Sequence, residues 1–256
     1  MSRDLPPVAV VLPTWIEEER VPRVLASLAR QTVPPARVVV VDGGSTDRTV
    51  ALVREAGVVV IEVAEDRRGR GNQIAVGVAA LERELDLVLI AHADMEFPPD
   101  AIEAVARAFA GDDQLAGGCL GHCFEANERF FRALERFNRF RAVWGVPFGD
   151  QAQFFRRSAL EEVGGVPSQP IMEDVELALR LLRLGSFVAL ERPVRVSARD
   201  FRRHGIRGAM TRYVVFLIAY ALGGPSACQA IHARYYAHHG RNRKSMVFHR
   251  SIPETS

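Results

Sequence analysis

The strongest constraint on the fold is a series of short, mostly apolar runs that alternate with helical patterns. The runs are Val8–Leu12, Val38–Val41, Val58–Val63 and Leu87–Ala91, and Glu62 is their one polar residue. Each run is too short for a typical helix, and its apolar composition is typical of a strand buried on both faces of a parallel sheet. Between the runs, apolar residues recur three and four positions apart. This alternation predicts a doubly wound, mostly parallel α/β sheet flanked by helices, with right-handed crossovers.

Composition fits an ordinary globular protein of one large domain, or of a core domain with an appendage. The chain has 256 residues, of which 48% are hydrophobic and 25% charged. Its three cysteines show no disulfide spacing, which favours a reducing compartment and predicts a cytoplasmic location. Cys119, His122 and Cys123 form a weak metal-site candidate, because no second ligand cluster lies near them in the sequence.

Charge divides the chain into an acidic body and a basic end. Residues 201–250 carry nine basic side chains and no acidic one, whereas residues 1–200 carry 24 bases against 30 acids. We therefore expect a domain over 1–200 and a basic segment over 201–256 that meets an anionic partner. Within this segment Tyr213–Leu222 is apolar, about 15 Å long as a helix and too short to span a bilayer. Two interpretations of this segment stay open. It is a helix that lies in the headgroup region on the inner side of a membrane, or it is a helix that packs on the domain or on a second copy of the chain.

Polar residues follow three of the predicted strands, at Thr14–Glu17, Asp42–Asp47 and His92–Asp94. In an open parallel sheet these ends meet at one crevice, where ligands bind. After Asp42, two glycines permit close approach of a ligand, and Ser45 or Thr46 can cap the next helix. Such a turn by itself is more often structural. His92 and Asp94 either hold a divalent metal with substrate phosphates, or Asp94 caps a turn, and the residues themselves favour neither.

The second half of the chain predicts further elements and a second acidic motif. We expect helices over Pro98–Ala110, Glu128–Trp144 and Val175–Leu184, a Gly-broken strand over Leu115–Phe124, a strand over Ala152–Arg156, and edge strands over Phe187–Leu190 and Val194–Ser197. The phenylalanines of the helix predicted over 128–144 are more typical of packing than of the wall of an acceptor groove. The arginines of this helix, of which Arg141 is the last, are typical of a solvated side. Glu173 and Asp174 either stabilise a helix dipole or supply a catalytic base.

Six motifs in a fixed order resemble the family 2 glycosyltransferases of the GT-A fold. They are Pro13-Thr14-Trp15-Ile16-Glu17-Glu18, VVVVDGGSTDRT from Val38, RGRGNQI from Arg68, His92-Ala93-Asp94, Gly149-Asp150-Gln151 and Met172-Glu173-Asp174. The resemblance covers about residues 8–200. It is strongest to a small bacterial branch that carries His-Ala-Asp where most members have Asp-x-Asp. Each motif is modest alone, but their order is specific.

The resemblance implies a role for each motif. The nucleotide-binding positions would be Pro13, Thr14, Glu17, Asp42, Gly43, Arg70 and Ala93, with Asp42 at the base and Glu17 near the ribose. Asp94 would reach Mg²⁺ or Mn²⁺ on the diphosphate. The catalytic group would be Asp174 as base with Glu173 and Asp150, and the donor and acceptor region would comprise Gly149, Gln151, Arg203 and His204. The implied reaction is inverting, metal-assisted transfer from a nucleotide sugar to an unknown acceptor, lipid-linked acceptors included. No nucleic-acid partner is expected.

Three positions depart from the broader family pattern, and two other functions remain as alternatives. Ile16 stands where Asn is usual, Gly43 where a second Asp is common, and His92 where the metal motif has its first Asp. A nucleotidyltransferase would need a Gly- and Lys/Arg-rich phosphate loop, but 13–20 is acidic. A non-enzymatic membrane-associated protein with a degenerate nucleotide pocket would not need the intact acidic pair at 173–174.

Overall fold

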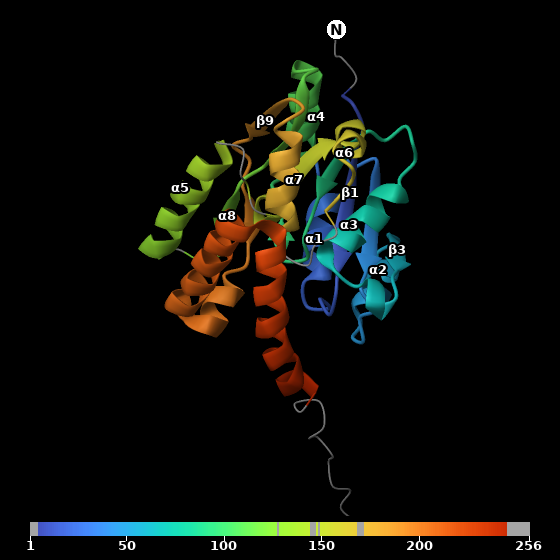
Figure 1. Ribbon diagram of the computed structural model, residues 1–256. Coiled ribbons are helices and arrows are strands. Elements are labelled where there is room, and N and C mark those ends of the chain that lie inside the picture. The colour runs from blue at the N-terminus through green and yellow to red at the C-terminus, as the bar shows by residue number, and fades with distance from the viewer. Residues whose placement is uncertain (1–4, 127, 144–146, 148, 168–171, 245–256) are drawn as a thin grey trace, which may run out of the picture.

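Two β-sheets form the framework of the chain (Figure 1). The computed structural model describes residues 5–126, 128–143, 147, 149–167 and 172–244. The larger sheet has seven strands in the order β3-β2-β1-β4-β8-β6-β9. In chain order these are β1 (Val8–Thr14), β2 (Arg37–Asp42), β3 (Val59–Glu62), β4 (Leu87–Ile90), β6 (Leu115–Cys119), β8 (Gln153–Arg156) and β9 (Ser186–Ala189). The smaller sheet, β5-β10-β7, is formed by Met95–Glu96, Val194–Val196 and His122–Phe124.

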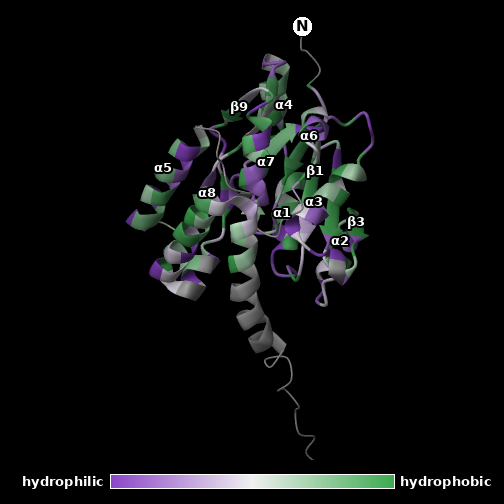
Figure 2. Cartoon of the chain, in the orientation of Figure 1, coloured by the Kyte–Doolittle hydropathy of each residue, from purple (hydrophilic) through white to green (hydrophobic). Residues whose placement is uncertain are grey.

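Most pairs in the larger sheet are parallel, as predicted. β1 pairs in parallel with both β2 and β4, and β2 with β3. β8 is the exception, because it runs antiparallel to β4 and to β6. The apolar runs are buried along the central strands (Figure 2), since helices cover both faces of a sheet of this type.

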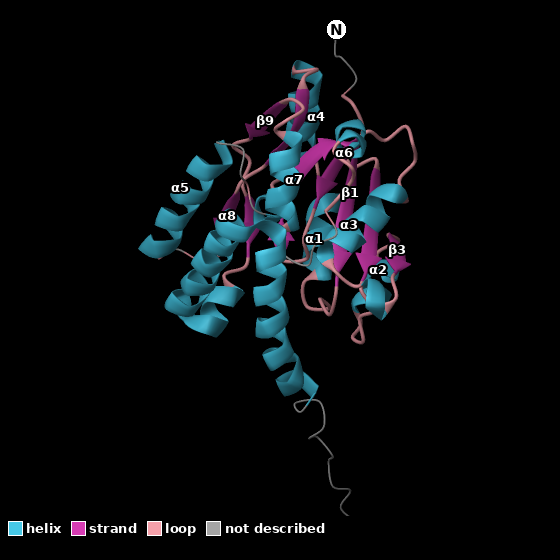
Figure 3. Cartoon of the chain, viewed as in Figure 1, coloured by secondary structure: helices cyan, strands magenta, loops and turns pink. Residues whose placement is uncertain are grey.

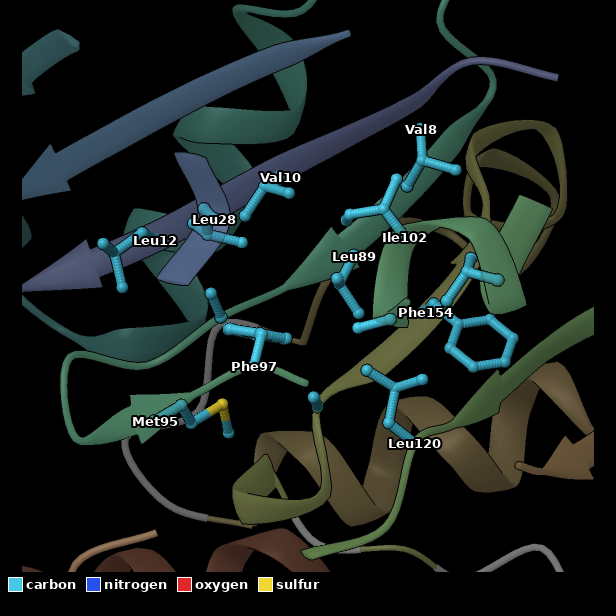
Figure 4. Packing of buried hydrophobic residues seen from close by; sticks show 14 of the residues in the cluster. Val8, Val10, Leu12, Leu28, Leu89, Met95, Phe97, Ile102, Leu120 and Phe154 are labelled. Carbon is cyan, nitrogen blue, oxygen red and sulfur yellow. The ribbon is translucent and has the colours of Figure 1, made fainter. Parts of the chain in front are cut away.

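Helices pack on both faces of the larger sheet (Figure 3). The helices of the described residues are α1 (Val21–Ala29), α2 (Thr49–Glu55), α3 (Arg70–Ala79), α4 (Ala101–Gly111), α5 (Arg129–Val143), α6 (Arg157–Glu162), α7 (Glu173–Leu181) and α8 (Arg199–Lys244), with single 3₁₀ turns at Glu65–Arg67 and Gly149–Gln151. The two cores of the larger sheet contain residues of α1–α4, α6 and α7. Alternate residues of β1 point to opposite faces. Val10 and Leu12 join α1 and α4 in one core, seen close up with Leu28 and Ile102 in Figure 4. Val11 joins α3, α6 and α7 in the other.

Several predicted boundaries were wrong, for local reasons. The sequence pattern between the third and fourth apolar runs predicts a helix from about Gln73 to Glu84, but α3 runs from Arg70 to Ala79. Leu115–Phe124 is two strands in different sheets, because Gly121 adopts a φ of +79° between them. The strand expected over 187–190 does lie at the edge of the larger sheet, as β9. The one expected over 194–197 was also placed at an edge, but β10 is the middle strand of the smaller sheet.

The close approach of α3 to the sheet requires glycine at position 77. A Cβ there would lie 2.4 Å from Cγ1 of Val11 and 3.1 Å from Cγ2 of Val41, both on central strands. Alanine in a helix interior normally gains up to about 1 kcal/mol over glycine, but overpacking costs about 1–3 kcal/mol. Gly77→Ala is therefore expected to lower the free energy of unfolding, measured by urea denaturation. Gly111→Ala, where an added Cβ meets nothing within 4 Å, is the control and should be neutral or stabilising.

The long helix α8 is interrupted twice and packs on α7. Its backbone leaves helical geometry at Gly205 and at Gly224, which precedes Pro225. The second break brings Cys228 back to Phe216, and both pack with Met172 and Val175 at the start of α7. The basic segment predicted from 201 onward therefore contacts the body of the protein within the described residues.

The apolar part of α8 is longer than the sequence analysis expected. Within the described residues, Gly205–Cys228 is long and apolar enough, by length and composition, to cross a membrane, and 17% of its most apolar stretch is buried. The predicted apolar segment, Tyr213–Leu222, was therefore too short, because the apolar stretch extends beyond it on both sides. The small and weakly polar residues at 208–211 extend the stretch.

Candidate active site

The polar strand ends meet in one crevice, at the point where the order of parallel strands reverses. β1 lies between β2 and β4, with Thr14 paired to Asp42 and the amide of Ala91 donating to the carbonyl of Val11. Doubly wound sheets bind ligands at this point. Pro13, Thr14 and Ala93 are buried there, so they shape the crevice through their backbones more than through exposed side chains.

Asp42 fixes the conformation of the turn that follows β2. Its side chain is fully buried, and both carboxylate oxygens accept hydrogen bonds from protein groups. Oδ1 accepts from the amides of Gly44 (2.9 Å) and Ser45 (2.7 Å), and Oδ2 from the hydroxyls of Thr14 (3.0 Å) and Ser45 (2.6 Å). Neither Ser45 nor Thr46 caps α2. Asp47 accepts from the amide of Thr49 instead (3.0 Å). The contact of Asp42 with a nucleotide base stays a prediction.

Two residues that the sequence analysis did not assign hold this edge of the crevice. Gln73 donates from Nε2 to the carbonyls of Thr14 and Val41, each at 2.8 Å, and so ties the ends of β1 and β2 together. Arg68 donates from Nε to the carbonyl of Gly43 at 2.6 Å and stacks over Trp15 at 4.6 Å. A Cβ on Gly43 would lie 3.0 Å from Cγ of Arg68, which gives a steric reason for glycine there. The sequence did contain a signal for Gln73, because an amide side chain on an otherwise apolar helix face usually has hydrogen-bond partners in the core.

Three non-glycine residues with positive φ each adjoin a predicted site residue. They are Ile16 (57°), Ala152 (50°) and Met172 (61°), next to Glu17, Gln151 and Glu173. Such backbone angles are uncommon outside glycine and cluster at functional sites. At Ile16 the angle is held by a 2.8 Å hydrogen bond from its amide to the Ser45 hydroxyl. Backbone strain is therefore concentrated around this crevice.

Carboxylates at the mouth of the crevice carry an excess of negative charge. Asp94 is solvent-accessible, but the surrounding protein removes part of its hydration, and this loss raises the pKa of its carboxyl group. The negative charges of Glu17 and Asp150 raise that pKa further. Glu17 is partly neutralised by Arg20 at 2.5 Å. Oxygen ligands with unneutralised charge suit Mg²⁺ or Mn²⁺. Among the described residues no group of three or more His, Cys, Asp or Glu side chains could hold a metal. The role of Asp94 as a metal ligand stays a prediction.

Arg70 connects α3 to the acidic start of α7. It pairs with the Glu173 carboxylate, and its guanidinium lies 3.5 Å from Oδ2 of Asp174. Burial by itself would lower the pKa of Arg70, but these two carboxylates outweigh it and raise the pKa. Glu173 is 2% exposed, and burial raises its pKa even though Arg70 opposes the shift. Its second oxygen has no hydrogen-bond partner among the residues that the structure describes.

Asp174 is placed differently from its neighbour. Its side chain is 12% exposed, and one oxygen accepts from the amide of Val175 at 2.8 Å. Both acids line a small pocket with His92 and Gln153. Glu173 and Asp174 occupy the first turn of α7, so the helix-dipole interpretation also fits their location. A carboxylate that is reachable from a pocket and held by a cation is geometrically able to accept a proton.

The Gly149-Asp150-Gln151 turn is fixed by a buried polar network. Gln151 is 1% exposed and donates from Nε2 to the carbonyl of Asn138 at 3.3 Å. Asn138 is 3% exposed, and its Nδ2 lies 3.3 Å from Nε2 of His122. Nδ1 of His122 lies 3.8 Å from Oδ1 of Asp150. From the sequence, no role was predicted for Asn138, and His122 was predicted only as part of a weak metal candidate.

Arg141 and Tyr213 complete the site from α5 and α8, and both were missed. Arg141 was predicted on a solvated side, but burial lowers its pKa, and it faces Asp150 and Asp174. Burial raises the pKa of Tyr213 to about 12, with Arg141 and the same two carboxylates close by. Both contact Asn138, at 3.3 Å and 3.4 Å. Arg203 and His204 lie in α8, but their side chains fall outside the described residues, so their role stays a prediction.

The sequence of this chain is similar to that of known proteins, and its fold is similar to that of solved structures. The model of the family "Glycosyl transferase family 2" matches residues 9–164. The 4,4'-diaponeurosporenoate glycosyltransferase of Staphylococcus haemolyticus is 32% identical over 107 residues, which cover 40% of this chain and 28% of that protein. The probable glycosyltransferase YdaM of Bacillus subtilis is 24% identical over 204 residues, covering 72% and 48%. The chain spans less than half the length of these two relatives.

Solved structures share the fold at low sequence identity. A mannosyltransferase from Pyrobaculum calidifontis, in complex with GDP-Man and Mn²⁺, aligns with a TM-score of 0.65 and 22% identity, covering 89% of this chain and 70% of its own. Residues 1–349 of TarS from S. aureus, in complex with UDP, align with a TM-score of 0.61 and 17% identity, covering 75% and 60%. These likenesses establish a GT-A-like fold. Since the family model matches more than half of the sequence, the chain belongs to glycosyltransferase family 2.

Proposed function

We propose that the protein transfers a sugar from a nucleotide-sugar donor to an acceptor hydroxyl, with inversion at the anomeric carbon. The observation that carries this proposal is the Arg70–Glu173–Asp174 group beside the crevice of β1 and β4. Asp174 is the general base, because it is the more exposed member of the acidic pair, at 12% against 2% for Glu173. Arg70 and Glu173 orient it, and the fully buried carboxylate of Glu173 keeps the guanidinium in place.

The leaving diphosphate calls for positive charge on the other side of the crevice. Asp94 would hold Mg²⁺ or Mn²⁺ together with diphosphate oxygens, because the negative charges of Glu17 and Asp150 near it favour a bound cation. When bound, such a cation neutralises charge that develops on the departing phosphate. Glu17, Asp42, Gly43 and Arg70 are proposed to line the nucleoside pocket, with Arg68 and Trp15 forming its wall. Relatives in complex with nucleotide and Mn²⁺ support this assignment.

Thermal unfolding with nucleotides tests the donor site. UDP, GDP, CDP and CTP are each added with and without Mn²⁺ to the wild type and to Asp94→Asn. A ligand at 100 times its Kd adds about 2.7 kcal/mol, so one nucleoside diphosphate should raise the melting temperature by roughly 5–10 °C. We expect the shift to need Mn²⁺ and to be lost in Asp94→Asn.

Asp113→Asn is the control for this measurement, because Asp113 is exposed and lies away from the crevice, just before β6. It should keep the full shift. A shift with CTP alone would favour a nucleotidyltransferase, and the acidic loop at 13–20 argues against that. No shift with any nucleotide would favour a non-enzymatic protein with a degenerate pocket.

We also propose that the protein works at the inner face of a membrane as a peripheral protein. Support comes from the basic segment 201–250 and from the exposed apolar side of α8. Flotation with vesicles of phosphatidylcholine and phosphatidylglycerol tests this. Removal of residues 208–256 should abolish the flotation, whereas unchanged flotation of the truncated chain would contradict it.

A further inference from the structure

Two neighbouring helices expose an unusual amount of apolar surface. Phe137 and Phe140 of α5 are 52% and 63% exposed, and Val214, Val215, Ile218 and Leu222 of α8 are 43%, 41%, 53% and 85% exposed. Single exposed apolar residues are ordinary, but six on adjacent helices mark a surface that meets a partner. These six residues are called the α5–α8 face below.

The two helices are adjacent along much of α5. Phe201 of α8 packs edge-on against Phe130 and Phe131 of α5, with ring centroids 5.8 Å and 5.3 Å apart. Twelve positions further along α8, the Tyr213 hydroxyl lies 3.4 Å from Oδ1 of Asn138. Figure 2 shows hydrophobic residues on both helices, interleaved with hydrophilic ones. The exposed apolar residues therefore lie on two helices that contact each other.

This face borders the catalytic carboxylates. Arg141 directly follows Phe140, and Tyr213 directly precedes Val214. Both Arg141 and Tyr213 contact Asn138, which reaches His122, and His122 lies 3.8 Å from Asp150. The charges of Asp150 and Asp174 act on both residues. A molecule that lies with an apolar chain along the α5–α8 face therefore has its polar end beside Asp174. A water-soluble acceptor would gain nothing from this arrangement.

The charges around the face select an anionic lipid surface as its partner. Arg132 and Arg136 of α5 and Arg207 of α8 are exposed, and 201–250 holds no acid. Glu135 of α5 is turned inward, accepting from the amide of Phe124 at 2.7 Å. Apolar side chains flanked by arginine are typical of helices that lie in a membrane interface.

α8 is held to the protein in a way that favours lying on the bilayer over crossing it. The Tyr220 hydroxyl donates to Glu176 of α7, and Phe216 is 6% exposed in the core shared with α7. A helix fixed along one side to the catalytic domain cannot also be surrounded by lipid. Its free side, which carries Ile218 and Leu222, remains available to the bilayer.

We infer that the acceptor is a hydroxyl-bearing lipid of an anionic membrane, taken up along the α5–α8 face; this rests on the proposed transferase function. The lipid hydroxyl oxygen forms a bond to the anomeric carbon of the donor sugar. The bond from that carbon to the diphosphate oxygen breaks, and its electron pair leaves with the nucleoside diphosphate. The hydroxyl proton passes to the Asp174 carboxylate.

Entry of the face into lipid can be measured directly. Phe140→Trp and Val59→Trp are each added to vesicles of phosphatidylcholine and phosphatidylglycerol that carry brominated acyl chains. Val59 is 39% exposed on β3, at the far edge of the larger sheet, and serves as the matched control. Bromine should quench the indole at 140 at least twofold more than the one at 59. Equal quenching at both positions would overturn the docking of this face.

The acceptor itself is tested by following labelled sugar. The full chain is incubated with a radiolabelled nucleotide sugar and, separately, with membranes and with the soluble fraction of the cells that produce it. Label should enter the chloroform–methanol extract of the membranes. The double variant Val215→Ser, Ile218→Ser should lower that incorporation at least tenfold and keep the wild-type melting shift with nucleoside diphosphate, whereas Val59→Ser should change neither.

The outcomes separate this inference from the function on which it rests. Label in the soluble fraction only, or equal lipid labelling by the double variant and the wild type, overturns the lipid acceptor while leaving the transferase intact. No transfer to either fraction contradicts the proposed function, and the lipid acceptor with it.

Discussion

Asp174→Asn should slow sugar transfer by orders of magnitude and leave donor binding intact. A positioned general base contributes about 10²–10⁴ in rate, and an amide cannot accept the proton of the acceptor hydroxyl. The substitution preserves shape, and an amide oxygen can still accept the hydrogen bond from the Val175 amide at 2.8 Å. We therefore expect kcat to fall by about 10²–10⁴, within the range of a lost base. KM for the donor and the melting shift with nucleoside diphosphate should stay within twofold of the wild type.

The neighbouring carboxylate provides a contrast within the same motif. Glu173 is buried against Arg70, so Glu173→Gln acts through the orientation of Arg70 and Asp174 and not on the acceptor proton. It should lower kcat less than Asp174→Asn does and should leave the acidic limb of the pH profile in place. If Glu173→Gln were the more damaging change while Asp174→Asn kept wild-type turnover, the base would be assigned to the wrong residue.

Removal of Arg70 should produce the largest loss of stability among the site variants. Arg70→Met leaves the 2% exposed Glu173 without its counter-charge. Breaking a buried ion pair from one side costs about 3–5 kcal/mol. Arg70 is itself 39% exposed, and solvent screening reduces the effect. We expect the free energy of unfolding to fall by about 2–4 kcal/mol near pH 7, measured with urea.

The pH dependence and a second substitution identify the cause of that loss. Burial raises the pKa of Glu173 in the folded protein above its unfolded value, and loss of Arg70 raises it further. The folded variant then binds more protons than the unfolded chain, so stability increases as the pH falls. The deficit of Arg70→Met should be smallest near the ordinary glutamate pKa and grow as the pH rises from there. Adding Glu173→Gln should recover at least half of it. A deficit that is constant with pH would point to lost packing of the arginine stem.

Sequence patterning predicted the central sheet well because its signal is local. A run such as Leu87–Ile90 is apolar in every residue, and the strand that it forms is buried in every residue. The motifs that follow β1, β2 and β4 were placed correctly at one crevice, since strand ends in a parallel sheet share an edge. The paired acids at 173 and 174 were expected at the start of a helix, and α7 begins at Glu173.

The predictions failed where the structure depends on contacts between distant segments. Arg141 appears in sequence as one of five arginines on a polar helix side. Only the packing of α8 on α5 shows that it faces Asp150 and Asp174. Tyr213 and Asn138 were missed for the same reason, because these two hydrogen-bond partners lie 75 residues apart in the sequence. The aromatic stripe of α5 was predicted to be packing, which holds for Phe131 but not for Phe137 and Phe140.

Release of nucleoside diphosphate from a panel of nucleotide sugars tests the assignment most directly. The wild-type chain is incubated with each donor, Mn²⁺ and membranes of the producing cells, in parallel with Asp174→Asn and Asp113→Asn. One donor should release its nucleoside diphosphate with the wild type and Asp113→Asn, at least 100-fold faster than with Asp174→Asn, in keeping with the loss of a general base. Release that is equal in Asp174→Asn, or absent with every donor, would contradict a family 2 transferase that uses Asp174 as its base.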